Sequence, residues 1–280
     1  MGLLDFILNL AGVLIWLNWR ALRFDPLSGS TPASLVGTLR RAEPRRSRRW
    51  YLLGVLLVLL VARALLYCQL GPAVSWAPSL RLGATAIFFR SDFLNRMLLF
   101  SFFSFGLALG MLYLWLLLIS LVNGRAVDGE LSHRLLRVHL GRVQGWPWPV
   151  KLALPLCLSV IFWLGAGLLL VHFNIIPAAP STRLRVEQGF VLGLGAYLLW
   201  KYLIAAVLAL YLISSYIYFG DQPFWRFVTS TSRNLLLPLR WLPLKLGKLD
   251  FAPILVIALV FLAAGLAERW LAILYVRLPL

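Results

Sequence analysis

Four charged side chains lie inside long apolar runs of this sequence, where a charge is costly and therefore indicates a specific role. They are Arg63, Lys201, Glu268 and Arg269. Lys201 and Glu268 have opposite charges, and a helix rise of ~1.5 Å per residue puts them at similar depth in the outer leaflet. Two interpretations stay open: a buried ion pair at a functional cavity, or long side chains that extend separately to the interface.

Other residue types that support catalysis or metal binding occur without a suitable spacing. The histidines are His133, His139 and His172, and none lies three or four residues from another, as metal-binding pairs on a helix do. Cys68 and Cys157 form no CxxC motif, and the acidic residues form no paired-carboxylate motif. We therefore expect no catalytic residues, no metal, no cofactor and no enzymatic activity.

The composition indicates that the charged residues belong to a membrane protein. Of the 280 residues, 61% are hydrophobic, and the mean hydropathy is +0.85, whereas a soluble domain is about half apolar. Apolar runs long enough to cross a bilayer occupy residues 3–19, 50–70, 97–122, 150–172, 189–219 and 252–276. The expected fold class is therefore all-α, a polytopic membrane bundle of about six transmembrane helices.

Two details of these runs bear on how the helices pack. The first run is the weakest, because Asp5, Asn9 and Asn18 interrupt it. GxxxG spacings occur at Gly106–Gly110 and at Gly189–Gly193. Pairs of this kind allow two helices to approach closely, so they favour helix packing without identifying a partner.

Basic residues alternate between the loops and predict the orientation of the chain. Segment 20–49 carries eight arginines, and segments 123–151 and 220–250 carry five Lys or Arg residues each. The alternate loops, 71–96 and 173–188, carry three and two. We expect the first set in the cytoplasm and both termini outside. The net charge of +17 then indicates contact with anionic lipid headgroups, not with nucleic acid.

An internal repeat divides the chain. Residues 36–82 align without a gap with residues 138–184, and APSLRL in the first copy matches APSTRL in the second. The repeated unit is a helix in, a basic cytoplasmic segment, a helix out and a short outer loop. We expect three such hairpin repeats in one membrane domain, at residues 1–96, 97–188 and 189–280.

Residues 222–238 predict an amphipathic helix that lies in the headgroup plane. Pro223 suits the first helical turn, Asp221 is a candidate cap before it, and Pro238 ends the helix. The two faces differ in polarity: one has Phe224, Phe227, Thr231 and Leu235, and the other has Arg226, Ser230 and Arg233.

The stretch NLLLPLRWLPLKLGKLDFAP at 234–253, which begins within this helix, is too charged to cross a bilayer and too apolar for an ordinary loop. Gly247 permits a turn with positive φ, and we expect Asp250 to cap the last membrane helix, with Pro253 near its first turn. Residues 222–250, here called the interfacial segment, would thus join two membrane helices on the cytoplasmic side. The residues that define this motif are Pro223, Phe224, Arg226, Phe227, Arg233, Pro238, Arg240, Pro243, Lys245, Gly247, Lys248, Asp250 and Pro253.

These residues resemble a known family. PFWRFV, RNLLLPLRWLP and GKLDFAPILVIALVFL, within 209–276, look like the repeat of the YggT (YlmG) family of integral membrane proteins, in which RPLRRLLP and GGIDFSP precede a second helix. The middle copy, 97–172, lacks the Gly-Asp pair, and the first helical pair is extra. The resemblance implies a multi-pass protein of the bacterial inner membrane with a non-enzymatic role in assembling membrane machinery.

The expected function is therefore to organise or assemble other membrane proteins, in cell division or in the maturation of a membrane complex. The expected partners are anionic lipid headgroups and other membrane proteins or a second copy of the chain. The alternative, from a different class, is an ion channel or transporter in osmotic stress that uses the Lys201–Glu268 region. Few polar residues lie within the spans, which disfavours a wide pore.

Cysteine labelling tests the orientation. In a cysteine-free background, cysteines in place of Ser79 and Ser181 should react with an impermeant reagent in cells whose outer membrane is permeabilised, because both lie in the weakly basic loops. Cysteines in place of Arg45 and Lys245 should stay unlabelled. Labelling of the second pair without the first would reverse the orientation.

Overall fold

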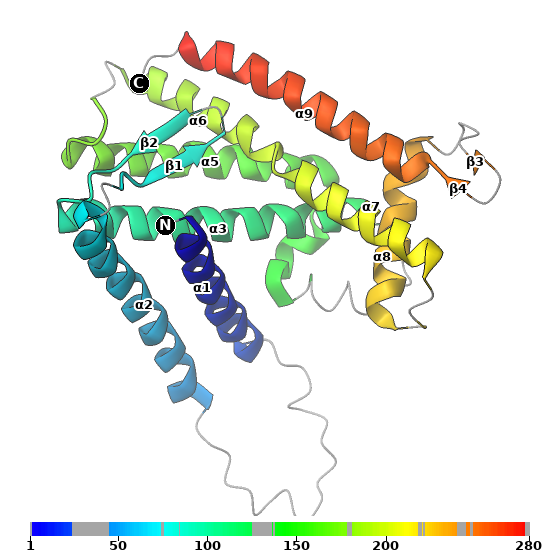
Figure 1. Cartoon of the computed structure of the whole chain (residues 1–280), viewed down its shortest axis with the longest axis horizontal. Helices are drawn as coiled ribbons and strands as arrows, with labels where there is room; N and C mark the ends of the chain where they lie inside the picture. Colours follow the sequence, from blue (N-terminus) through cyan, green and yellow to red (C-terminus); the bar gives the residue numbers. More distant parts are fainter. Residues whose placement is uncertain are drawn as a thin grey trace, which may run out of the picture. The chain divides into compact units, whose positions relative to one another are not determined.

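The computed structural model describes residues 2–23, 45–73, 76–83, 85–124, 136, 138–177, 181–217, 220, 222–239, 245–246 and 249–277. Within these residues the fold is all α, as the sequence predicts, with two short hairpins of two strands each (Figure 1). The helices are α1 (Gly2–Arg23), α2 (Arg45–Ala73), α3 (Leu94–Val122), α5 (Trp148–His172), α6 (Thr182–Tyr197), α7 (Trp200–Tyr216), α8 (Pro223–Leu236) and α9 (Ala252–Val276), and the strands are β1 (Ser79–Leu82), β2 (Thr85–Phe88), β3 (Lys245–Leu246) and β4 (Leu249–Asp250).

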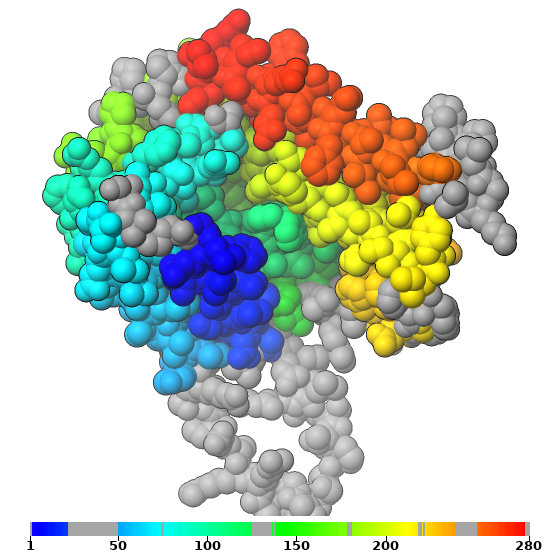
Figure 2. Space-filling view, in the orientation of Figure 1, coloured from blue at the N-terminus to red at the C-terminus, as the bar shows by residue number. Residues whose placement is uncertain are grey.

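Six helical stretches in the described residues are long and apolar enough to cross a membrane. They are Gly2–Ala21, Trp50–Ala73, Leu94–Val122, Trp148–His172, Thr182–Tyr216 and Ala252–Val276. Each overlaps one of the predicted runs, so the prediction of a multi-pass membrane protein is confirmed. Figure 2 shows α9, in orange to red, on the face in view. Its apolar side chains Leu262 and Trp270 are exposed, as expected of a helix that faces lipid.

The fifth stretch, predicted as one run, consists of two helices. Leu198 and Leu199 separate α6 from α7. Their N–H groups donate to carbonyls only three residues earlier, of Gly195 at 3.2 Å and of Ala196 at 3.1 Å, which is the pattern of a 3₁₀ turn. Both helices together span 35 residues, which is more than the roughly 20 that a straight crossing needs.

Two tryptophans hold this break against α3. Hydrocarbon tolerates an interrupted helix only where neighbouring groups satisfy its backbone. The indole N–H of Trp115 in α3 donates to the Leu199 carbonyl at 3.2 Å, and the indole N–H of Trp200 in α7 donates to the Leu114 carbonyl at 3.1 Å. The break is therefore a bonded feature of the bundle and is not an end that frays.

The chain divides into two compact units. The first unit contains Met1–Leu80 and Phe88–Gly110, and the second contains Arg81–Ile87 and Met111–Leu280. The boundary falls inside α3, so this helix contributes residues to both. The division of the sequence into three hairpin repeats, at 1–96, 97–188 and 189–280, stays a prediction.

Each unit has antiparallel helix pairs. In the first, α1 packs on α2, and the buried side chains of Leu56, Leu60 and Phe105 form a core with residues of α1 around them. A methyl group on Gly12 of α1 would come within 2.9 Å of the Phe105 ring. In the second, α5 lies along α6, and α7 lies along α9 (Figure 1).

Small residues set the distance between α5 and α6. A Cβ atom on Gly189 would lie 3.0 Å from the Cα atom of Val160, and one on Gly193 would lie 3.1 Å from the Cβ atom of Ser159. Backbone atoms of the two helices thus approach as closely as GxxxG packing allows. A Cβ on Gly106 or Gly110, the other GxxxG pair, would meet no atom within 4 Å.

Alanine at Gly189 and Gly193 should lower the stability of the protein. The new methyl groups must force α5 and α6 apart, and overpacking of this kind costs about 1–3 kcal/mol. The matched control puts alanine at Gly106 and Gly110, where open space and the higher helix propensity of alanine predict a neutral effect or a gain of about 0.5–1 kcal/mol. Thermal unfolding in mild detergent measures both; equal effects of the two pairs would contradict the packing described for α5 and α6.

Candidate functional site

The amphipathic helix of the interfacial segment is α8, and it begins at Pro223 as predicted. It ends at Leu236, and a 3₁₀ turn from Leu237 to Leu239 follows, which contains Pro238. The helix cap lies one residue later than predicted: Gln222 occupies the N-cap position, and its side chain makes no capping hydrogen bond. Asp221 lies outside the described residues. Because proline has no N–H, Pro223 removes one of the groups that a cap would satisfy.

One side of α8 is attached to the chain's own membrane helices. Thr231 and Ser232 are buried, with 2% and 0% of their surfaces exposed. Asn123, just after α3, donates from Nδ2 to Thr231 Oγ1 at 2.9 Å and accepts at Oδ1 from Asn234 Nδ2 at 3.1 Å. Ser232 Oγ donates to the Val207 carbonyl of α7 at 3.3 Å. Polar contacts thus fix α8 to two membrane helices.

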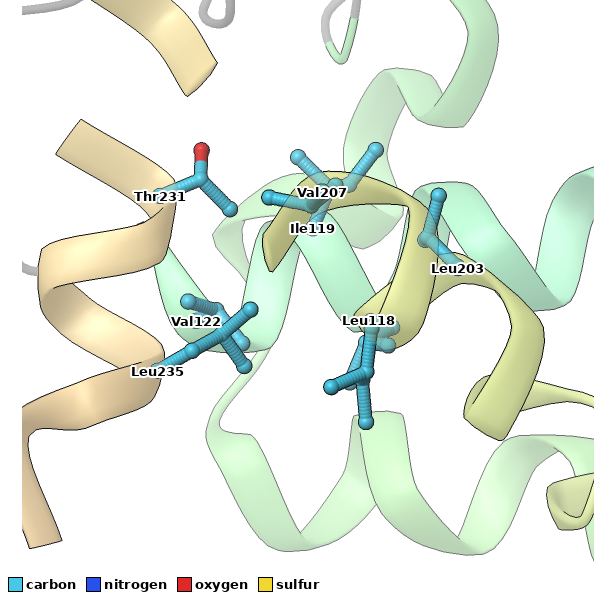
Figure 3. Close-up of a pocket in the computed structure, with 8 residues that line it drawn as sticks. Leu118, Ile119, Val122, Leu203, Val207, Thr231 and Leu235 are labelled. Atoms are coloured by element: carbon cyan, nitrogen blue, oxygen red, sulfur yellow. The ribbon is translucent and has the colours of Figure 1, made fainter. Parts of the chain in front are cut away.

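A small apolar hollow lies between the same three helices (Figure 3). Its cavity volume is about 10 Å³, about the room of one water molecule, which is far too small for an organic ligand. Its lining consists of Leu118, Ile119 and Val122 of α3, Leu203, Ile204 and Val207 of α7, and Thr231 and Leu235 of α8. Two residues of the predicted apolar face, Thr231 and Leu235, therefore face other helices of this chain.

The opposite side of α8 is exposed. Arg226 and Arg233 are both exposed and lie seven residues apart, so they share one face and are separated by ~10 Å along the helix. Phe224 is 46% exposed and forms an edge contact with Trp225 at a ring distance of 5.2 Å. The face with Arg226 and Arg233 thus points away from α3 and α7, while Phe224, four residues before buried Val228, lies at the exposed start of the other face.

The second half of the interfacial segment is described only in part. Arg240, Pro243, Gly247 and Lys248 lie outside the described residues. Lys245 and Asp250 are paired in the antiparallel hairpin of β3 and β4.

The predicted cap at Asp250 is wrong, because Phe251 occupies the N-cap position of α9 and has no capping side-chain hydrogen bond. Asp250 ends a strand instead. Pro253 lies in the first turn as predicted and is buried. Since Pro253 has no N–H, it removes one of the orphan donors of that turn.

The structure brings Lys201 and Glu268 together. Lys201 Nζ lies 3.4 Å from Glu268 Oε2, with 12% of the lysine side chain and 48% of the glutamate side chain exposed. The contact follows from chain length: Lys201 is 15 residues before Tyr216, the end of α7, and Glu268 is 16 residues after Ala252, the start of α9. Antiparallel helices therefore bring both to one level, ~23 Å from these ends.

A second polar centre, which the sequence reasoning missed, joins α1, α2 and α3 in the first unit. We call its five residues the N-terminal polar network: Asp5, Asn9, Arg63, Tyr67 and Ser104. Arg63 donates from Nη2 to Asp5 Oδ1 and from Nη1 to Asn9 Oδ1, both at 2.6 Å. The Tyr67 hydroxyl donates to the same Asp5 oxygen at 3.0 Å, and Ser104 Oγ accepts from Asn9 Nδ2 at 2.9 Å.

Arg63 is the centre of this network. It is 1% exposed, and its guanidinium carbon lies 5.4 Å from the centre of the Tyr67 ring and 5.9 Å from that of Phe100. The sequence does contain a signal for the site: Asp5 and Asn9 are four residues apart, and so are Arg63 and Tyr67. This spacing places each pair on one face of its helix, although it does not say that the two faces meet.

A further cation, Lys151, is buried near the start of α5. It is 6% exposed, and its amine donates to Ser120 Oγ of α3 at 2.9 Å. His172 lies in the last turn of α5, and His133 lies outside the described residues. Within the part of the chain that the structure describes, no group of three or more His, Cys, Asp or Glu side chains is placed to hold a metal ion.

Comparisons with known proteins add no relative: no protein-family model, no curated protein and no solved structure matches this chain. The resemblance of the interfacial segment to the YggT family therefore stays a hypothesis that rests on its motif residues. The function has to be argued from the geometry described above.

A double-mutant cycle tests whether Lys201 and Glu268 interact. Lys201→Met and Glu268→Gln should destabilise the protein non-additively, because each leaves the other charge without its partner. A coupling of about 0.5–1 kcal/mol is expected, at the low end because the carboxylate is half exposed. The exposed Arg183–Glu187 pair, four residues apart on α6, is the control and should show less coupling. Additive effects at Lys201 and Glu268 would indicate two side chains that reach the interface independently.

Proposed function

We propose that this protein organises or assembles other membrane proteins, without catalysis, through the exposed arginine-bearing face of α8. The observation that carries the proposal is the attachment of α8 to other helices of the chain. Its buried side is occupied by α3 and α7 of the same chain, and its opposite side presents Arg226 and Arg233. A helix fixed in this way presents its arginine-bearing face to a partner in one orientation.

The attachment of α8 also bears on a second interpretation, in which the interfacial segment is a membrane clip that binds only lipid and holds the last two membrane helices at a fixed angle. A helix that only binds lipid buries its apolar face among the acyl chains. In α8 the side chains of Val228 and Thr231 are buried, and Leu235 lines the hollow shared with α3 and α7. Much of the apolar side of α8 is therefore covered by this chain itself, while Arg226 and Arg233 are exposed on the other side.

The proposed setting follows from the loops and from the motif residues. The excess of Lys and Arg in the segment 220–250 favours a cytoplasmic position for α8. The resemblance of 209–276 to the YggT family favours the bacterial inner membrane, with both termini outside. The proposed process is cell division or the maturation of a membrane complex, and the proposed partner class is an integral membrane protein with acidic cytoplasmic residues.

The alternative function, an ion channel or transporter, is favoured by one observation. The break at Leu198–Leu199 lies directly before Lys201, and transporters use interrupted helices to place backbone carbonyls and charged groups at ion sites. The Leu199 carbonyl, however, already accepts the Trp115 indole N–H and the backbone N–H of Tyr202. A carbonyl bonded in this way is a poor ion ligand, so we rank this function second. Ion flux through the purified protein in liposomes would reverse the ranking.

Replacement of the two arginines of α8 tests the first proposal. The Arg226→Gln/Arg233→Gln variant should lose a co-purifying membrane protein in mild detergent while it keeps its expression level and melting temperature, because both side chains are exposed. The matched control is Arg183→Gln/Arg185→Gln, which removes the same charge from the first turns of α6, expected on the other side of the membrane. Loss of the same protein from both variants would contradict a specific role of α8. Loss from neither variant would also contradict it and would indicate that the interfacial segment is only a membrane clip.

A further inference from the structure

Arg63 lies near the middle of an apolar helix. Within the membrane-spanning stretch Trp50–Ala73, it is 13 residues from the first end and 10 from the last, or ~20 Å and ~15 Å along the helix. Only 1% of its surface is exposed. A guanidinium stays charged at this depth, so its position is tolerable only with a counter-charge and hydrogen-bond acceptors beside it. Asp5 and Asn9 of α1 supply both, at 2.6 Å each.

The helix that supplies the counter-charge is the weakest of the six spans. Its mean hydropathy is 1.5, against 1.9–2.4 for the other five. Only 6% of its span is fully buried inside the molecule, the smallest share among the six. Lipid is as apolar as a leucine side chain, and apolar contact alone therefore gives little preference for protein over lipid. The polar contacts therefore add specificity to the packing of Val13, Ile15 and Trp16 against the core of α2 and α3.

The hydrogen bonds of the Asp5 carboxylate leave no acceptor oxygen without a donor. Oδ1 accepts from Arg63 and Tyr67, while Oδ2 accepts from Asn9 and Ser104 at 3.3 Å each. Arg63 is 1% exposed and Asp5, in the first turn of α1, is 23% exposed, and in hydrocarbon no water replaces a lost partner. Removal of Arg63 would leave a carboxylate in the span of α1, and removal of Asp5 would leave a guanidinium in the span of α2.

We propose that α1 stays in the membrane only while the charge of Asp5 is paired within the N-terminal polar network, so that it becomes a transmembrane helix only once α2 and α3 are in place. Arg63 is the residue on which this depends, because it alone carries the charge opposite to that of Asp5 in the network. The dependence is reciprocal: α1 needs Arg63 for its carboxylate, and α2 needs Asp5 for its guanidinium. Through this pairing, insertion of α1, the least hydrophobic span, depends on correct assembly of the first unit.

Accessibility of a cysteine in the middle of α1 tests the proposal in the full chain. Leu14 is 57% exposed on the protein surface, so a cysteine there faces lipid while α1 is in the bilayer and is unreactive to a water-soluble thiol reagent. In a cysteine-free background, with the reagent on both sides of the membrane, Arg63→Leu should raise the labelling of Leu14→Cys from background to that of a cysteine in place of the exposed Arg183.

A matched control and a rescue variant separate this dependence from general misfolding. Leu57 of α2 is 56% exposed, and a cysteine there should stay unlabelled in every variant. The double variant Asp5→Leu/Arg63→Leu contains neither charge, so labelling of Leu14→Cys should return to background. Two outcomes would overturn the proposal: background labelling in Arg63→Leu, which means that α1 stays inserted by itself, or equal labelling in the single and double variants, which means that lost packing and not the unpaired charge releases the helix.

Discussion

Hydrocarbon offers no hydrogen-bond partner, and this constraint accounts for the polar contacts on which the described helices depend. Arg63 of α2 is tolerated because Asp5 and Asn9 of α1 bond to it. The interruption between α6 and α7 is tolerated because Trp115 and Trp200 connect it to α3. In both places a polar group within one span determines which helix must be its neighbour.

The two units show two different ways of holding membrane helices together. Because lipid and leucine are equally apolar, neighbouring helices need either close backbone approach or polar bonds. The pair α5 and α6 uses the first, through Gly189 and Gly193, and adds a buried hydrogen bond from Trp163 Nε1 to Gln188 Oε1 at 3.2 Å. The pair α1 and α2 uses the second, through Asp5 and Arg63. The first gives a tight apolar contact, and the second makes two helices depend on each other.

The attachment of α8 follows the same rule at the end of α3. Asn123 bonds both Thr231 and Asn234, and Ser232 bonds the backbone of α7. A short amphipathic helix on a membrane surface is otherwise held only by lipid. Fixed to two membrane helices, α8 keeps the orientation of its arginine-bearing face, and this orientation is the physical basis of the function proposed for it.

Several features were accessible from the sequence because each depends on the chain near it. The spans follow from apolar length, and the start of α8 follows from Pro223. The meeting of Lys201 and Glu268 could be anticipated by counting residues along antiparallel helices. The cap expected at Asp250 was wrong, because the backbone there pairs with Lys245 in a hairpin and α9 begins only after Phe251.

By itself, the sequence determined that this is an α-helical membrane protein with an amphipathic helix between its last two spans. Only the tertiary structure decided which faces meet. Asp5 and Asn9 interrupt one run and Arg63 another, yet nothing in either run says that they bond to each other. The physical reason is that a face in contact with lipid and a face in contact with protein are equally apolar in a membrane helix, so periodicity cannot tell them apart.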